Sequence, residues 1–437
     1  MPTHPPELLL VMRILHTSDW HIGQHFISKS RAAEHQAFIS WLLEQVTTQK
    51  VDAVIVAGDV FDTGTPPSYA RKIYNSFIVE MSKLKCQLVV LGGNHDSVSM
   101  LDESKELFAS LGTHVIPNVQ EITDQQVFVL NDVKGEAGAI LCAIPFIRPR
   151  DVIGSQAGAS SSDKQQALGE AIATHYKKLY DYADAKRADF KQPLPIIATG
   201  HLTAMGVTTS DSVRDIYVGS LEAFPAKAFP PADYIALGHI HRPQIVAKSE
   251  HIRYCGSPIP LSFDELGTQK QVLIAEFADG KLTSVEPLLV PRFQPMQVIR
   301  GDLESIQKQL LLLPTEPAQA DMFGDLIASE EKPTALPIWL CIEVETQDYL
   351  DDLQQRVQAM TADMNVEILQ LRRARTGRQA QITQEAKETL NELSVEDVFE
   401  RRLALETFET KSDQQRLARI RETFGEIVEV VKSGDAS

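Results

Sequence analysis

Five short polar clusters hold the side chains of this sequence that are best suited to bind metal ions. Each cluster stands where an apolar run ends, and each run has the length and β-rich composition of a buried strand, as residues 51–57 do before the second cluster. Because ligands of open α/β sheets bind outside the carboxyl ends of the strands, we expect the clusters to meet at one rim. The clusters are Asp19-Trp20-His21, Gly58-Asp59, Gly93-Asn94-His95-Asp96, Gly200-His201 and Gly238-His239-Ile240-His241.

The donor atoms in these clusters belong to carboxylate, imidazole and amide groups, with no thiolate among them. This set suits Mn²⁺, Fe²⁺ or Zn²⁺. Two metals about 3.5–4 Å apart need a bridging ligand, and Asp59 is the best candidate because Gly58 lets the backbone turn sharply beside it. Asn94 offers a neutral carbonyl oxygen to the second metal, and His201 would complete that shell. The pattern therefore predicts a two-metal hydrolase.

Two pairs of ligands share a spacing of i and i+2. Asp19 and His21 form the first pair, and His239 and His241 repeat it. In an extended chain, residues two apart point to the same side, so each pair is suited to a common target. We expect Asp19 and His21 to bind a single metal.

His95 differs from the other cluster histidines because it follows the proposed ligand Asn94 and precedes Asp96. A carboxylate beside an imidazole can fix its tautomer and raise its pKa. We therefore predict that His95 and Asp96 are catalytic, with His95 orienting the phosphate or protonating the departing oxygen. The alternative is a structural histidine behind the metals.

The composition permits several classes of function and excludes others. At 437 residues the chain is expected to form two or three domains, and no apolar stretch is long enough to span a membrane. The formal net charge of −17 argues against binding nucleic acid through a bulk positive field, although bound metals would add positive charge where a phosphate lies. Four separated cysteines predict buried thiols in a reducing cytoplasm. They are Cys86, Cys142, Cys255 and Cys341.

Helices are expected between the strands that position the clusters. Apolar residues at helical spacing predict helices over residues 29–47 and 67–84, and a third follows near 167–185 after a Gly- and Ser-rich loop at 154–166. Strands that alternate with such helices indicate βαβ units and a mostly parallel sheet.

Changes in composition and in the expected secondary structure divide the chain into four predicted segments. Residues 1–11 are expected to be a dispensable N-terminal extension, and residues 12–290 a metal-binding α/β unit. Residues 291–376 have the strand and helix patterns of a small α+β domain. Residues 379–437 carry two amphipathic helices, which either pack on their own domain or dock on a partner.

The ordered set D-x-H, GDxFD, GNHD, GH and GHxH resembles the calcineurin-type metallophosphoesterase superfamily. Longer motifs, including VAGDVFDTGTPPSYAR, TGHLT and YCGSPIPLSFDE, are similar to the SbcD family, the nuclease subunits of bacterial SbcCD complexes. The likeness covers nearly the whole chain from residue 12. It implies a metallophosphoesterase β-sandwich flanked by helices, with a small α+β capping domain and C-terminal helices.

The resemblance also implies two metal shells that share Asp59. The metals would be Mn²⁺ foremost, with Mg²⁺, Fe²⁺ or Zn²⁺ as alternatives, and His95 would be the catalytic histidine. Metal one would be bound by Asp19, His21, Asp59 and His241, and metal two by Asp59, Asn94, His201 and His239.

The activity implied by the resemblance is hydrolysis of DNA, as a 3′→5′ double-strand exonuclease and a single-strand and hairpin endonuclease in recombination, replication and repair. Residues 291–376 would face DNA, and residues 379–437 would dock on a coiled-coil ATPase of the SbcC type. ATP would be used only by that partner, and the chain would form a homodimer within a heterotetramer at the cytoplasmic nucleoid. The alternative is a phosphodiesterase for cyclic or dinucleotides, which leaves the additional domain and terminal helices unexplained.

One sequence difference from the related phosphoprotein phosphatases argues against a phosphatase function. Phosphoprotein phosphatases of the superfamily carry GDxxDRG, whose arginine binds phosphate, whereas this chain reads Asp62-Thr63-Gly64. The missing arginine counts against a protein phosphatase.

Overall fold

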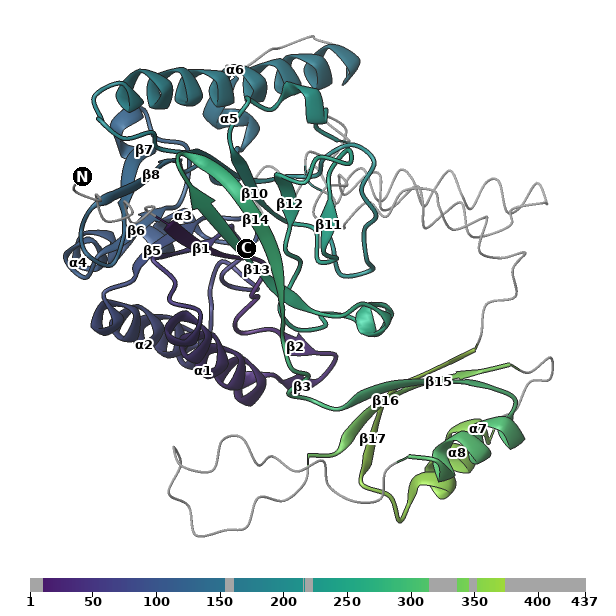
Figure 1. The fold of residues 1–437 in the computed structure, drawn as a ribbon. Helices are drawn as coiled ribbons and strands as arrows, with labels where there is room; N and C mark the ends of the chain where they lie inside the picture. The colour runs from purple at the N-terminus through teal and green to yellow at the C-terminus, as the bar shows by residue number, and fades with distance from the viewer. Residues whose placement is uncertain are drawn as a thin grey trace, which may run out of the picture. The chain divides into compact units, whose positions relative to one another are not determined.

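Two six-stranded sheets form the centre of the larger part of this computed structural model (Figure 1). The structure describes residues 11–153, 161–214, 216, 223–313, 336–345 and 352–373. The predicted extension, apart from Val11, and the predicted C-terminal helices of residues 379–437 lie outside the described residues.

The first sheet is mostly parallel. Its strands are β1 (Val11–Thr17), β4 (Ala53–Val56), β5 (Gln87–Leu91), β6 (Thr113–Ile116), β13 (Gln271–Ala278) and β14 (Lys281–Leu289). They lie in the order β14-β13-β1-β4-β5-β6, and β1, β4, β5 and β6 run parallel. The hairpin of β13 and β14 pairs antiparallel with β1, so it closes this side of the sheet.

The second sheet repeats this plan with a parallel centre. Its strands are β7 (Val127–Asn131), β8 (Ala137–Cys142), β9 (Ile196–His201), β10 (Tyr234–Gly238), β11 (Gln244–Ile245) and β12 (Ile252–Tyr254). The order is β11-β12-β10-β9-β8-β7, with β8, β9, β10 and β12 parallel and the two outer strands antiparallel.

Both faces of the central strands β4 and β5 of the first sheet are buried, which explains their continuous apolar runs. In β4, Ala53 and Ile55 belong to the core that lies between the two sheets, whereas Val54 and Val56 belong to the core under the covering helices. Strands with two buried faces lose the polar alternation of a half-exposed strand. The α/β sandwich flanked by helices is therefore as predicted.

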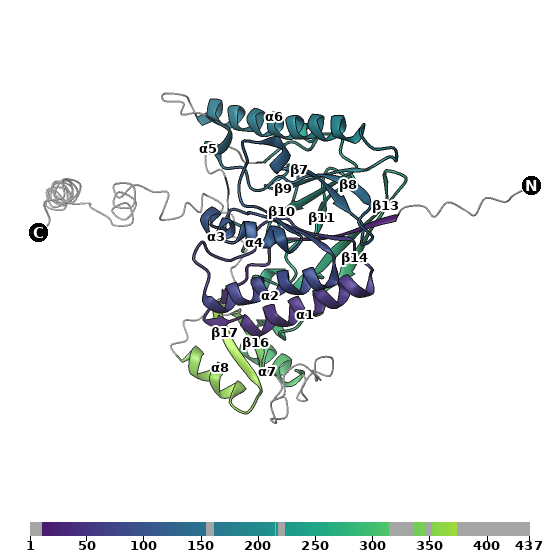
Figure 2. The same ribbon diagram turned by 90° about the vertical axis from the view of Figure 1, so that its left-hand side faces the viewer.

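Helices cover the outer faces of the sandwich. Helices α1 (Ala32–Thr48) and α2 (Ser68–Leu84) pack side by side on the first sheet, and α6 (Ser161–Arg187) covers the second (Figure 2). The first two match the predicted helices. Helix α6 begins at Ser161, within the predicted loop, and Asp163 in its first turn interacts favourably with the helix dipole.

Short elements connect these layers. The remaining helical turns are α3 (Val98–Asp102), α4 (Lys105–Ser110), α5 (Pro149–Val152), η1 (Thr123–Gln125), η2 (Ala226–Ala228) and η3 (Phe263–Gly267). Strands β2 (His25–Phe26) and β3 (Lys29–Ser30) form a hairpin directly after the first polar cluster. None of the described helices is long and apolar enough to cross a membrane.

A third, three-stranded sheet follows the sandwich in the chain. It contains β15 (Met296–Gly301), β16 (Ile338–Val344) and β17 (Val366–Arg373), with helices α7 (Leu303–Leu311) and α8 (Leu353–Thr361). All three strands run parallel and share a core with both helices. Trp339 of β16 stacks on Phe26 of the β2–β3 hairpin with ring centroids 5.7 Å apart. The predicted limits of this domain, 291–376, stay a prediction.

We predict that Phe277→Ala destabilises the sandwich. Phe277 is 1% exposed and lies between the two sheets. Its truncation should lower the free energy of unfolding by about 3–5 kcal/mol because a cavity remains. The control is Leu289→Ala, because the side chain of Leu289 on the edge strand β14 is 56% exposed. This substitution should change the free energy of unfolding by less than about 1 kcal/mol. Equal urea midpoints for the two variants would contradict this assignment of the core.

Candidate metal centre

The predicted ligands lie at the carboxyl ends of parallel strands from both sheets. Asp19 follows β1, Asp59 follows β4 and Asn94 follows β5, all in the first sheet. His201 ends β9 and His239 follows β10 in the second sheet. The clusters therefore meet at one rim, as expected, and the packing of the two sheets forms that rim.

Three groups of potential metal ligands occur among the described residues, and all are buried. Within each group the ligand atoms lie within 4.8 Å of one another. Two groups divide the predicted ligands into two shells, and the third joins His95 to both. The groups are Asp19, His21 and His241; Asp59, His201 and His239; and His21, Asp59 and His95.

Asp59 and Asn94 lie where the groups meet. The Oδ2 atom of Asp59 is 3.3 Å from Nε2 of His201 and 3.6 Å from Nε2 of His21. The Oδ1 atom of Asn94 is 2.9 Å from Nε2 of His201 and 3.2 Å from Nδ1 of His239. Asp59 is thus placed to serve both shells, and Asn94 is placed to serve the second.

The backbone at four of the ligands adopts the left-handed region. The φ angles are 54° at Asp19, 47° at His21, 51° at Asp59 and 93° at His239. Few residues other than glycine adopt these values, and their concentration at a site indicates functional strain. The prediction that an extended chain aligns Asp19 with His21 is wrong, because β1 ends at Thr17 and tight bends orient both side chains.

Glycines admit the close approach of these loops. A Cβ atom on Gly93 would lie 2.1 Å from Oδ1 of Asp59, and one on Gly58 would lie 2.2 Å from Nδ1 of His201. Gly58 also has a φ of 94°. Any larger residue at either position would displace a predicted ligand.

Two ring nitrogens of the predicted histidine ligands are buried and have no hydrogen-bond partner among the described residues. His201 Nδ1 donates to the carbonyl oxygen of Ala57 at 2.9 Å, and His21 Nδ1 lies 3.2 Å from Asp62 Oδ1. Such bonds leave Nε2 with the lone pair that a metal requires. The Nε2 atoms of His21 and His239 are buried without a hydrogen-bond partner in the described chain. These orphaned atoms and the mixed carboxylate–imidazole donor set fit divalent metal ions.

The charges of the site depend on one another. Burial works against the Asp59 carboxylate, but His201, His95 and His21 hold its pKa well below the usual range. Burial likewise opposes a charged His201, yet Asp59 and Asp19 raise its pKa to about 9. The buried carboxylates therefore attract positive charge into the site, which protons or divalent cations can supply.

The side chain of Asp96 makes different contacts from those predicted. Its carboxylate makes no hydrogen bond to the His95 ring, so the expectation that it fixes the tautomer of His95 is wrong. Burial, with Asp59 adding to it, raises the pKa of Asp96 to about 6. The carboxylate accepts hydrogen bonds from the backbone N–H groups of Val60 at 3.2 Å, Phe61 at 2.9 Å and Gly93 at 2.8 Å.

The carbonyl oxygen of Asp62 orients His95 instead. His95 Nδ1 donates to this oxygen at 2.8 Å, which leaves Nε2 as the nitrogen available to a substrate. Burial lowers the pKa of His95 to about 4, although Asp59 partly opposes this shift. The expected rise in the pKa of His95 is therefore not found, and the imidazole is neutral at pH 7.

Comparisons with known proteins agree with this architecture. Residues 12–243 match the calcineurin-like phosphoesterase family, and residues 292–407 match the SbcD_C family, described as the type 5 capsule protein repressor C-terminal domain. The SbcD subunit of the SbcCD nuclease from Escherichia coli (strain K12) is 55% identical over 406 residues, 93% of this chain and 96% of that protein.

This chain belongs to the SbcD family. Two further proteins that carry the same name each match 65% of this chain and 71% of their own length. They are 36% identical in Rhodobacter capsulatus and 30% identical in Bacillus subtilis. The predicted family, fold and class of metal-dependent nuclease are confirmed, and the small-molecule alternative is not favoured.

Sequence reasoning missed a group of residues around His241 in this SbcD-family chain. Ser212, Glu265 and Lys270 surround that histidine and are not metal ligands themselves. Glu265 lies in the motif YCGSPIPLSFDE, which carried the family resemblance, but nothing in its spacing marks it as a neighbour of His241. Only the fold shows that contact.

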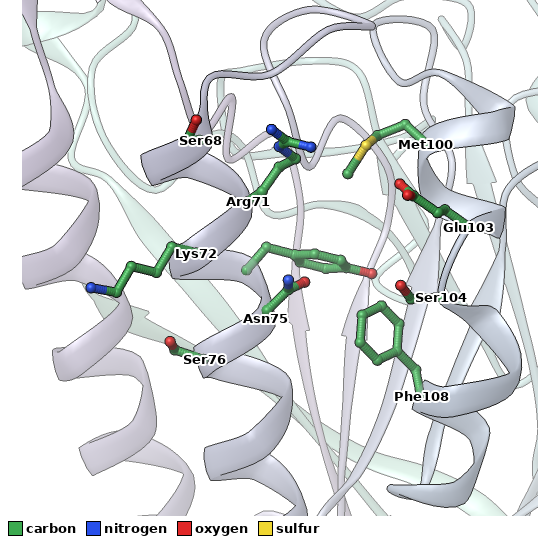
Figure 3. A pocket seen from close by; sticks show the side chains of 10 residues that line it. Ser68, Arg71, Lys72, Asn75, Ser76, Met100, Glu103, Ser104 and Phe108 are labelled. Carbon is green, nitrogen blue, oxygen red and sulfur yellow. The ribbon is translucent and has the colours of Figure 1, made fainter.

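A separate cavity of about 430 Å³ lies between α2 and the α3–α4 segment (Figure 3). None of the predicted site residues lines it, so it is distinct from the metal centre. The Tyr74 ring lies at the cavity and packs edge-on against Phe61, close to the second polar cluster. The lining residues are Ser68, Arg71, Lys72, Tyr74, Asn75, Ser76, Met100, Glu103, Ser104 and Phe108.

We predict that Asp96→Ala destabilises the protein even without metal. The substitution leaves three buried backbone donors without an acceptor. Each unsatisfied donor costs about 1–3 kcal/mol, so the loss of three acceptors should lower the free energy of unfolding by at least about 3 kcal/mol. Urea unfolding in a chelator measures this, with Asp102→Ala at an exposed site as the control. Equal stability of the two variants would show that the Asp96 hydrogen bonds are dispensable.

Proposed function

We propose that this SbcD-family chain is a two-metal DNA phosphodiesterase. The observation that carries the proposal is the joining of two buried ligand groups at Asp59, with His95 beside both. When bound, two divalent ions would neutralise charge on a reacting phosphate and lower the pKa of nearby water. Their shells would be Asp19, His21, Asp59 and His241 for metal one, and Asp59, Asn94, His201 and His239 for metal two.

We propose Mn²⁺ as the native metal of both shells. Nitrogen and oxygen donors without thiolate favour it over metals that prefer soft ligands, and Mg²⁺, Fe²⁺ and Zn²⁺ are the alternatives to be tested. Metal analysis of protein purified without chelators would distinguish them.

His95 is the proposed catalytic residue because its ring lies within the ligand group of His21 and Asp59. The carbonyl oxygen of Asp62 holds Nδ1 protonated, so Nε2 is the atom that receives and releases a proton. An anionic phosphate near the ring favours its protonated form, from which Nε2 can donate to the departing oxygen. Asp96 acts indirectly, because its carboxylate accepts hydrogen bonds from the N–H of Val60, next to Asp59, and from the N–H of Gly93, next to Asn94.

DNA is the proposed substrate, and an SbcC-type coiled-coil ATPase is the proposed partner. The relatives are named as subunits of the SbcCD nuclease. We extend to this chain the 3′→5′ double-strand exonuclease and the single-strand and hairpin endonuclease activities, in recombination, replication and repair. Residues 291–376 would face DNA, and residues 379–437 would dock on the partner, which alone uses ATP. A homodimer within a heterotetramer at the nucleoid completes this proposal.

We predict that His95→Gln retains its metals but loses nuclease activity by about two orders of magnitude or more. Hairpin DNA and bis(p-nitrophenyl) phosphate should be assayed in parallel with Mn²⁺, and metal content should be measured on the same samples. His114→Gln is the control, because His114 stacks on Phe128 outside the ligand groups. Near-normal cleavage by His95→Gln would refute its role, and turnover of the small ester without DNA cleavage would favour the small-molecule alternative.

We predict that the full chain, purified from its native cells, brings with it a large coiled-coil ATPase. The matched control is a chain that ends at residue 373, where the described third sheet ends. That control should lose the partner if residues 379–437 form the docking segment. Equal recovery with both chains would contradict the docking role, and absence of the ATPase from both would contradict the complex.

A further inference from the structure

A buried ion pair lies next to the metal centre and contributes no predicted metal ligand. Glu265 Oε2 is 2.5 Å from Lys270 Nζ, and the two side chains are 0% and 5% exposed. Burying two charges is expensive, and their mutual attraction rarely offsets the whole desolvation penalty. The pair therefore calls for an explanation beyond stability.

The carboxylate reaches the ring of His241 through Ser212. The Ser212 hydroxyl donates to Oε1 of Glu265, and Ser212 Oγ lies 2.6 Å from Nδ1 of His241. Glu265 Oε1 is itself 3.3 Å from Nδ1. Because the hydroxyl hydrogen points to the carboxylate, the serine oxygen accepts from the ring. Nδ1 of His241 therefore carries hydrogen, and Nε2 carries the lone pair.

Lys270 holds the backbone of His241. Its ammonium group donates to Glu265 Oε2, to Ser257 Oγ at 2.7 Å and to the carbonyl oxygen of His241 at 3.0 Å. These three bonds use all three of its hydrogens. The ion pair thus holds both the ring and the main chain of His241.

We propose that Glu265 is a positioning residue that, through Ser212, holds His241 as a ligand for metal one. This inference rests on the metal shells of the proposed function. It gives the buried ion pair a specific task, in which Lys270 stabilises the charge of Glu265 and fixes the carbonyl of His241. No contact links Glu265 to the ligand group of Asp59, His201 and His239 among the described residues. The effect should therefore be selective for metal one.

The test measures Mn²⁺ binding by calorimetry to the full-length Glu265→Gln and Ser212→Ala variants, with His241→Ala to identify metal one. Loss of the supporting bond to a ligating histidine weakens metal binding by about 10- to 100-fold. We expect that loss at metal one, and a change below about threefold at metal two. Ring ¹⁵N resonances of His241 in metal-free protein should also report a shift away from the Nδ1–H tautomer.

The matched control is Glu34→Gln. Glu34 is also a buried acid paired with a buried base, with Oε2 2.6 Å from Nη2 of Arg31, and it contacts no predicted ligand. It should lose stability without loss of metal one. Thermal unfolding in a chelator checks that each variant is folded. If Glu265→Gln does not fold, the same metal-binding measurement on Ser212→Ala still tests the proposal.

Two results would overturn the positioning role. One is unchanged affinity for both metals in folded Ser212→Ala or Glu265→Gln, with the wild-type tautomer of His241. The other is equal weakening of both metals, which would indicate general disruption. Because these readouts need no DNA, the outcome is separate from the success or failure of the proposed nuclease activity.

Discussion

The buried carboxylate of Asp59 is the constraint on which the rest of the site depends. A charge in the interior is unfavourable unless opposite charges and hydrogen bonds surround it. Here it receives the N–H of His95 at 2.9 Å on one oxygen and faces two histidines with the other. Gly93 leaves the space that the carboxylate occupies. His239 of the fifth cluster lies in the same ligand group as this carboxylate, so all five polar clusters contribute to its surroundings or, in the case of the second, contain it.

The sandwich makes this arrangement possible because it brings two sets of strand ends together. The ligands of the first sheet lie on loops that follow parallel strands, whereas in the second sheet His201 is the last residue of β9 and His239 directly follows β10. Hydrogen bonds then join the loops across the sheets, as when His239 N–H donates to Asp19 Oδ1 at 2.9 Å. The position of the metal centre is thus a consequence of sheet packing, and the apolar core between the sheets supports it.

Much of this structure could be predicted from the sequence. Apolar runs and helical periodicity are local patterns, so the strands before each cluster and the helices α1 and α2 were recognisable. The sharing of Asp59 and the placing of His201 with Asn94 were inferred from residue types and spacing, whereas the sorting of His241 with Asp19 and of His239 with Asp59 came from the family resemblance. Left-handed backbone at Asp19 and His21 gives no signal in residue spacing, so an extended chain was the wrong expectation there.

The roles of supporting residues were harder to predict from the sequence. Adjacency in sequence indicated Asp96 as the partner of His95, but its side chain turns toward the backbone of the second cluster, and the Asp62 carbonyl takes its place. Residues that act through others, such as Glu265, leave no pattern in a single sequence.

The left-handed backbone at Asp19 and Asp59 has a practical consequence. Aspartate and asparagine tolerate this conformation better than other residues with a side chain. Replacing either aspartate by asparagine would remove negative charge while leaving the bend of the main chain intact. These substitutions should therefore abolish hydrolysis without changing the conformation of the loops. Such variants are suitable for capturing a bound nucleic acid in an uncleaved state.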